Sequence, residues 1–184
     1  MATALVLLTD GFEEIEAVTI IDVLRRGEVA VTTASLGVRR VTGSHQITLE
    51  ADLMLDGLAV EDFDALVLPG GPGAKTLRED PRAQAVIQRA ASAGKLVAAV
   101  CAAPTALEAA GVLVGKRATA YPGNALPSAR QVEDRVVEDG NVITSRGPGT
   151  AMAFALKLVE RLSGPLVAEN TAERLLFSSP SDSR

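Results

Sequence analysis

Residues 95–107, KLVAAVCAAPTAL, decide how this chain folds. The run Leu96–Val100 is apolar and is typical of a strand buried on both faces of a parallel sheet. The alanine-rich segment after it predicts a helix, because Pro104 suits a first helical turn, where its missing N–H costs nothing. Cys101, the only cysteine of the chain, therefore lies on a sharp strand-to-helix turn, like a nucleophile elbow with sulfur in place of oxygen.

The position of Cys101 allows two interpretations. Helix N–H groups and the helix dipole at such a turn favour an anion, so we expect the pKa of this thiol to be lowered. A free cysteine in an apolar run is also often a small packing residue without chemistry. Position alone leaves the two evenly balanced.

Composition limits the fold and the partners. The 184 residues suffice for one domain, and with 47 % hydrophobic but only 3 % aromatic residues the core must be aliphatic, as in a parallel α/β sheet. A net charge of −5 without a basic cluster gives no indication of a nucleic-acid partner. One cysteine excludes an intrachain disulfide and, with one histidine, argues against a zinc site. We therefore expect no metal.

No segment has the pattern of a targeting or membrane sequence. Residues 1–8 lack a basic leader and end at Asp10-Gly11, which is unlike a signal peptide. Residues 96–114 have the length of a membrane span but contain Pro104, Glu108 and Gly111. We expect a soluble cytoplasmic protein.

Strands and helices alternate along the chain. The predicted strands are Ala4–Leu8, Val29–Ser35, Asp64–Leu68, Leu96–Val100 and Ala118–Ala120, with a β excursion within Gly37–Leu55 and a hairpin of Arg135–Val137 and Val142–Thr144 turning at Asp139-Gly140. The predicted helices are Glu13–Arg26, Asp80–Ala93, Pro104–Ala110, Ala151–Leu162 (with Thr150 as its N-cap) and Pro165–Leu176. This pattern predicts a single α/β domain over residues 1–184, a three-layer α/β/α sandwich with a mostly parallel sheet and a frayed tail at 177–184.

Three loops are expected at one edge of this sheet, because ligands of open parallel sheets bind beyond the carboxyl ends of the strands. They are Asp10–Glu16, Pro69–Gly73 and Cys101–Ala103. A carboxylate, a bare glycine backbone and a thiol would then share one pocket. The glycine loop is not a phosphate loop, because no Gly-Lys-Ser/Thr follows it.

Two residues near these loops have simpler interpretations. We interpret Glu14 as a negative charge matched to the helix macrodipole, as Arg25 and Arg26 match the other end. His45, within the β excursion, is most simply a surface residue without ligands nearby.

At these loops the sequence resembles the DJ-1/ThiJ/PfpI superfamily, and more closely its DJ-1 and YajL branch, with a flavodoxin-like sheet. Four segments carry the resemblance in the family's order and spacing, covering the chain to about Gly164. They are GFEEIE at 11–16, VLPGG at 67–71, AAVCAAPT at 98–105 and TSRGPGT at 144–150.

The resemblance implies a role for three side chains. Cys101 corresponds to the reactive cysteine, and Glu16 to a protonated carboxyl that donates a hydrogen bond to the thiolate and lowers its pKa. A carboxyl in an apolar pocket beside an anion should have a raised pKa. Glu13 corresponds to a second carboxylate at the pocket mouth, a candidate proton shuttle.

The resemblance also implies a binding region for substrate or oxyanion at Gly70, Gly71, Ala102 and Tyr121, with the N–H groups of Gly71 and Ala102 as donors. Tyr121 stands where DJ-1 relatives have a histidine, so a Cys–His dyad is absent. Ala102 stands where PfpI-like proteases require a histidine, which disfavours protease chemistry.

The dimer contacts that the resemblance implies also depart from the family. His45 stands where many relatives carry an arginine that approaches the site across a dimer interface. Arg26 is then the nearest substitute. The family pairs as homodimers through its first helix and the β excursion.

The implied activity is a cofactor-free, glyoxalase III-type conversion of small reactive carbonyls such as methylglyoxal, with repair of glycated protein (deglycase) as a related reaction. The alternative is an oxidative-stress sensor or chaperone in which Cys101 is oxidised to sulfinate. The third possibility is a binding or structural protein with an idle cysteine.

Overall fold

The computed structural model describes residues 1–178. These residues form a central sheet from seven strands: β1 (Thr3–Leu8), β2 (Ala30–Ser35), β5 (Leu53–Met54), β6 (Ala65–Leu68), β7 (Leu96–Val100), β10 (Val136–Asp139) and β11 (Val142–Ser145). The strand order is β10-β11-β7-β6-β1-β2-β5, and every neighbouring pair is parallel except β10–β11. The prediction of one domain around a mostly parallel sheet is confirmed.

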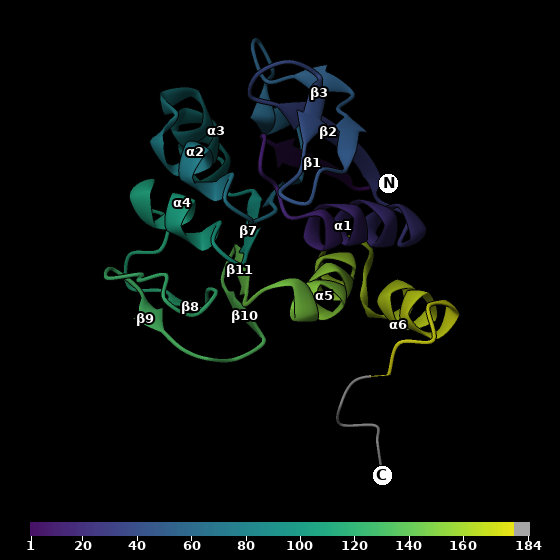
Figure 1. The fold of residues 1–184 in the computed structure, drawn as a ribbon. Helices are drawn as coiled ribbons and strands as arrows, with labels where there is room; N and C mark the ends of the chain where they lie inside the picture. Colours follow the sequence, from purple (N-terminus) through teal and green to yellow (C-terminus); the bar gives the residue numbers. More distant parts are fainter. Residues whose placement is uncertain (179–184) are drawn as a thin grey trace.

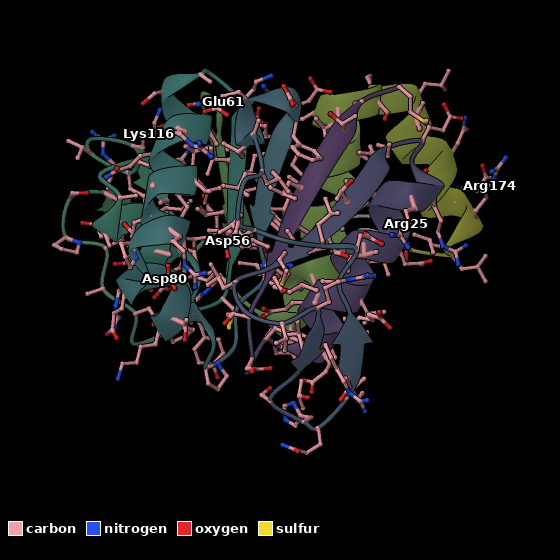
Figure 2. The ribbon with its side chains drawn as sticks, turned by 90° about the horizontal axis from the view of Figure 1, so that it is seen from above. Arg25, Asp56, Glu61, Asp80, Lys116 and Arg174 are labelled. Atoms are coloured by element: carbon pink, nitrogen blue, oxygen red, sulfur yellow. The ribbon has the colours of Figure 1, made fainter. Side chains whose placement is uncertain are left out.

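Helices cover both faces of this sheet (Figure 1). One layer contains α1 (Glu14–Arg26), α5 (Ala151–Ser163) and α6 (Pro165–Arg174), and the other α2 (Ala74–Glu79), α3 (Pro81–Ser92) and α4 (Pro104–Ala109). Figure 2 shows the two layers from above, with Arg25 of α1 on one side of the sheet and Asp80, which caps α3, on the other. Side chains of each central strand alternate between the two cores: Leu5 and Leu7 pack toward α2–α4, and Val6 and Leu8 toward α1 and α5.

The β excursion is also observed. β3 (Arg40–Thr42) and β4 (Thr48–Glu50) pair as an antiparallel hairpin outside the main sheet. β5 then pairs with β2 at the edge of the main sheet. The β10–β11 hairpin turns through Gly140 and Asn141, one residue later than predicted, with Gly140 at the positive φ of 63° that primed turns use first. Two short 3₁₀ helices, Val60–Asp62 and Pro148–Thr150, complete the connections.

Three local predictions differ from the structure. Helix α2 was not predicted, since it has only six residues and the glycine before it, Gly73, offers no side-chain cap. Thr150 does not cap α5: its hydroxyl donates to the Gly147 carbonyl at 2.9 Å and so closes the preceding turn instead. The short strand after Gly115 is β8 (Arg117–Ala118), paired with the unpredicted β9 (Arg130–Gln131). Beyond it, the Thr119 amide donates to the Thr144 hydroxyl.

The C-terminal end of the described chain is attached to the core. Phe177, the first residue of the predicted tail, packs against the α5–α6 side, and its amide donates to the Ala172 carbonyl at 3.0 Å. Residues 179–184 of that tail lie outside the described residues. None of the helices described in residues 1–178 has both the length and the apolar character needed to cross a bilayer.

Candidate active site

The three loops meet because their strands are neighbours. β6 lies between β1 and β7, with Val67 in register with Val6 on one side and Ala98 on the other. The loops that leave the carboxyl ends of these strands must therefore touch. The Glu13 amide donates to the Gly70 carbonyl at 3.0 Å, which joins the first loop to the second. The predicted convergence is confirmed.

Cys101 adopts a backbone conformation that side-chain-bearing residues rarely take. Its φ is 65°, in the left-handed region, where a non-glycine residue carries strain of about 1–3 kcal/mol. Hydrogen bonds on both sides hold it: its amide donates to the Ser145 carbonyl at 3.0 Å, and its carbonyl accepts from the Tyr121 amide at 2.8 Å. The predicted elbow is therefore present, with the cysteine 8 % exposed.

The glycine loop is bare because the cysteine and the carboxyl need its space. A Cβ at Gly70 would lie 2.6 Å from Cys101 Cβ and 2.9 Å from Glu16 Oε2. Gly71 has a φ of 89° and also leaves no room for a Cβ. Its amide and that of Ala102 act to lower the pKa of the Cys101 thiol.

Glu16 is a carboxyl group without any exposed surface. Its Oε2 accepts a hydrogen bond from the Gly70 amide at 2.8 Å, and the Cys101 thiol is its side-chain partner. Its Oε1 has no N–H or O–H donor among the described residues. Burial raises the pKa of Glu16 to about 7, against the opposing effect of the Gly70 hydrogen bond. An oxygen without a donor is the natural place for the proton of the neutral carboxyl.

The thiol does not follow the prediction of a lowered pKa. Burial, and then the negative charge of an ionised Glu16, raise the pKa of Cys101 to about 12, although the Gly71 and Ala102 amides oppose this. The prediction is wrong because it counted donors and the helix dipole but neither burial nor the like charge. Because the two groups are adjacent, a negative charge on Glu16 disfavours a second one on Cys101.

Glu13 lies at the start of α1 and is nearly buried, at 8 % exposure. Its Oε2 accepts from the Glu16 amide at 2.8 Å, so this carboxylate is the N-cap of the helix. The cap fixes the first turn of α1 and thereby the position of Glu16 next to Cys101.

The structure confirms His45 as a surface residue, with a side chain 74 % exposed, but places a carboxylate beside it and changes the interpretation of Glu14. The Glu14 side chain is only 7 % exposed, and it accepts hydrogen bonds from the His45 amide and ring, the Ser44 hydroxyl and the Ile47 amide. Burial alone would raise the pKa of Glu14, but the hydrogen bonds from His45 and Ile47 outweigh it and lower that pKa to about 2. Glu14 thus binds the β3–β4 turn to α1, a tertiary role with no signal in the local sequence.

Of the remaining residues that the sequence predicts for the site, Tyr121 lies beside Cys101 and Arg26 lies far from it. The Tyr121 amide donates a hydrogen bond to the Cys101 carbonyl, and the half-exposed Tyr121 ring lies against Gly147. Arg26 pairs with Asp22 at 2.7 Å and lies ten residues along α1 from Glu16, about 15 Å at 1.5 Å per residue. Arg26 therefore does not reach the site of its own chain.

Comparisons with known proteins agree with this architecture. Residues 2–161 match the DJ-1/PfpI family. The Drosophila melanogaster protein dj-1beta is 42 % identical over 182 residues, covering 96 % of this chain and 97 % of that protein. The Caenorhabditis elegans protein named glutathione-independent glyoxalase DJR-1.2 is 36 % identical, covering 89 % of this chain and 90 % of the relative. The crystal structure of Drosophila melanogaster DJ-1beta is similar with a TM-score of 0.92 at 41 % identity, covering 97 % and 99 % of the two chains.

The raised pKa of Glu16 predicts a pH-dependent stability. The unfolded chain releases this proton near 4.5 and the folded chain only near 7, so its contribution to stability is complete below pH 4.5 and is lost as the pH rises through 7. The loss should be on the order of 3 kcal/mol. In urea unfolding between pH 5 and 8, Glu16→Gln should lack this loss, whereas the exposed control Glu133→Gln should keep it. Parallel curves for wild type and Glu16→Gln would contradict the assignment.

Proposed function

This chain belongs to the DJ-1/PfpI family, and from that premise we propose that it converts α-oxoaldehydes such as methylglyoxal into 2-hydroxy acids without a cofactor. The observation that carries the proposal is the contact of a cysteine on a strained turn with a fully buried carboxyl group. The name of the nematode relative, glutathione-independent glyoxalase, supports the same reaction class.

The first step of the proposed reaction uses the shared proton of Cys101 and Glu16. In the singly ionised pair the charge moves to sulfur when the carboxyl takes the proton, and the amides of Gly71 and Ala102 favour that arrangement. The thiolate then attacks the aldehyde carbon. The C–S bond forms, the carbonyl electron pair moves to oxygen, and that oxygen takes a proton to give a hemithioacetal.

The second step moves one proton between adjacent carbons. A carboxylate removes the hydrogen of the former aldehyde carbon as a proton, giving an enediolate. The neighbouring carbon is then protonated, and the hydroxyl proton of the first carbon passes to the oxygen of the second. One carbon is oxidised to a thioester while the other is reduced to an alcohol, so no external oxidant is needed. Water cleaves the thioester to the hydroxy acid and restores the thiol. Glu16, with a pKa of about 7, is suited to this exchange, and Glu13 is adjacent.

The low exposure of Cys101 favours a small substrate. At 8 % exposure the cysteine leaves room for a compound of a few atoms more readily than for a modified protein side chain. The proposal is therefore the conversion of the free aldehyde, with deglycase activity as an extension of it. Cytoplasmic localisation stays a prediction from the sequence.

The reaction predicts a specific loss of activity. Cys101→Ala should abolish D- or L-lactate formation from methylglyoxal, and Glu16→Gln should lower kcat by about 10²- to 10⁴-fold, the usual contribution of a positioned proton-transfer group. The exposed Val114→Ala serves as a matched control with wild-type rates, since Val114 is 68 % exposed and away from these loops. Equal, slow consumption of methylglyoxal by wild type and Cys101→Ala would refute the proposal.

The same geometry supports a second function, the sensing of peroxide. The Gly71 and Ala102 amides that face the sulfur can hold added oxygens, and Glu16 can donate to one of them. Each oxygen comes from one peroxide molecule, which leaves as water. After mild peroxide treatment, mass spectrometry should show Cys101 with two added oxygens, and Glu16→Gln should give less of this product. The absence of that mass at Cys101 in the wild type would exclude a sensor.

We also propose a homodimer formed through α1 and the β excursion, as the family resemblance implies. Large apolar side chains remain exposed on this face: Ile15, Val18, Ile47, Leu53 and Met54. Val18 and Leu49 also line a cavity of about 340 Å³ between α1 and β4, so the two elements form one surface. Apolar surface of this kind on adjacent elements is typical of an interface.

A charge in the middle of that face should prevent pairing. Val18→Arg should elute as a monomer in size-exclusion chromatography with light scattering, because a desolvated and unpaired arginine disfavours association. Val114→Arg, at an exposed position on another part of the chain, should keep the wild-type mass. A wild-type protein that is monomeric at micromolar concentration would contradict the dimer.

A further inference from the structure

Residues 117–121, which are β8 and the three residues after it, lie beside β10 and β11 without being a strand of the central sheet (Figure 1). β8 pairs with β9 in a separate two-stranded sheet. On that side the Lys116 and Ala118 carbonyls accept from the Arg130 and Val132 amides at 2.8 and 2.9 Å. The other side of the segment faces the central sheet, and its backbone amides are available there.

Alternate amides of this segment bond the central sheet, as expected of extended chain, in which successive amides point to opposite sides. Their acceptors lie on or next to β10, β11 and β7. The three bonds run from Arg117 to Asp139 Oδ2 at 2.8 Å, from Thr119 to Thr144 Oγ1 at 2.9 Å and from Tyr121 to the Cys101 carbonyl at 2.8 Å. In a regular sheet all three acceptors would be carbonyls, but here two are side chains. The placement of the segment therefore depends on side-chain identity.

Thr144 is the middle acceptor and the buried one. Neither Thr144 nor Thr119 has exposed surface, so water cannot replace the hydroxyl as acceptor for the Thr119 amide. A buried amide without an acceptor is costly, which makes this bond hard to give up. Thr144 is also in register with Ala99 of β7, two residues before Cys101. Its hydroxyl is thus fixed relative to the strand that carries the cysteine.

Strand β11 holds the Cys101 turn from both sides. Ser145, the residue after Thr144, accepts directly from the Cys101 amide at 3.0 Å. The other side is held by the Tyr121 amide, which follows Thr119 by only two residues. A movement of the chain at Thr119 would therefore carry the Tyr121 amide away from the Cys101 carbonyl. Both bonds oppose relaxation of the positive φ of Cys101.

We propose that Thr144 is a positioning residue for Cys101. Its hydroxyl holds the Thr119 amide, and this bond places the Tyr121 amide against the Cys101 carbonyl. The strained turn then keeps the conformation in which the thiol lies against Glu16. The inference concerns the position of the thiol, and it does not depend on the proposed reaction.

Thr119 supplies a matched control. Its Oγ1 is buried and has no hydrogen-bond partner among the described residues, so it contributes its amide but not its hydroxyl. Thr144→Val and Thr119→Val therefore make the same chemical change at neighbouring, fully buried positions, and only the first removes an acceptor. Thr144→Ser keeps that acceptor and tests for rescue.

The first readout is the Tyr121 amide, which can be observed alone because the chain has one tyrosine. In protein labelled with ¹⁵N-tyrosine, Thr144→Val should speed hydrogen exchange of this amide by about tenfold or more. Thr144→Ser and Thr119→Val should keep the wild-type exchange rate.

The second readout is the thiol, which is also the only one of its kind in the chain. Alkylation by iodoacetamide as a function of pH should show a midpoint about one unit lower in Thr144→Val, because a relaxed turn separates the sulfur from the Glu16 charge that raises the Cys101 pKa. A loss of stability that left the turn intact would not move this midpoint. Thr144→Ser and Thr119→Val should have the wild-type profile.

Wild-type values in either readout for Thr144→Val, with a folded circular-dichroism spectrum, would overturn the inference. Equal changes in Thr119→Val would overturn it as well, since they would trace the effect to packing. Should Thr144→Val fail to fold, the wild type labelled with ¹⁵N-threonine and ¹⁵N-tyrosine decides. Equal protection of the Thr119 and Tyr121 amides supports the coupling, and a difference of more than about tenfold refutes it.

Discussion

The buried carboxyl group of Glu16 connects the loops that form the site. It lies without exposed surface between the Gly70 amide and the Cys101 thiol, so that two loops are joined through one side chain. Burial makes its ionisation costly, and the same burial makes it a proton donor near neutral pH. A cysteine beside it acquires a partner that no exposed carboxyl could provide. The burial of Glu16 therefore accounts both for its capacity to donate a proton and for the stability lost when it ionises.

The backbone around this contact is shaped to permit it. Cys101 occupies a left-handed conformation because the strand β7 must turn at once into α4, and Gly70 lacks a side chain because its Cβ would enter the cysteine. The strain persists because hydrogen bonds to Ser145 on one side and from Tyr121 on the other hold the turn. The arrangement of β1, β6 and β7 as neighbours brings all these groups to one edge.

The first turn of α1 shows how environment separates chemically identical side chains. Glu14 accepts hydrogen bonds from the β3–β4 turn, and its pKa falls to about 2. Glu16, two residues later, has few donors and full burial, and its pKa rises to about 7. Glu13, one residue before Glu14, caps the start of the helix. One turn of helix thus carries an anchor, a proton-holding group and a cap, and only their contacts distinguish the three.

The layers, the parallel sheet, most element boundaries and the elbow at Cys101 could be predicted from the amino-acid order. They follow from apolar runs, glycine stops and proline starts that act within a few residues. The convergence of the three loops could be predicted as well, through the rule that parallel strands present their carboxyl ends at one edge. The role of Glu14, the surroundings of His45 and the direction of the Cys101 pKa shift became visible only in the folded chain. These depend on burial and on donors more than thirty positions away along the chain, or on the charge of a neighbour across the sheet edge, and no local pattern encodes such distances.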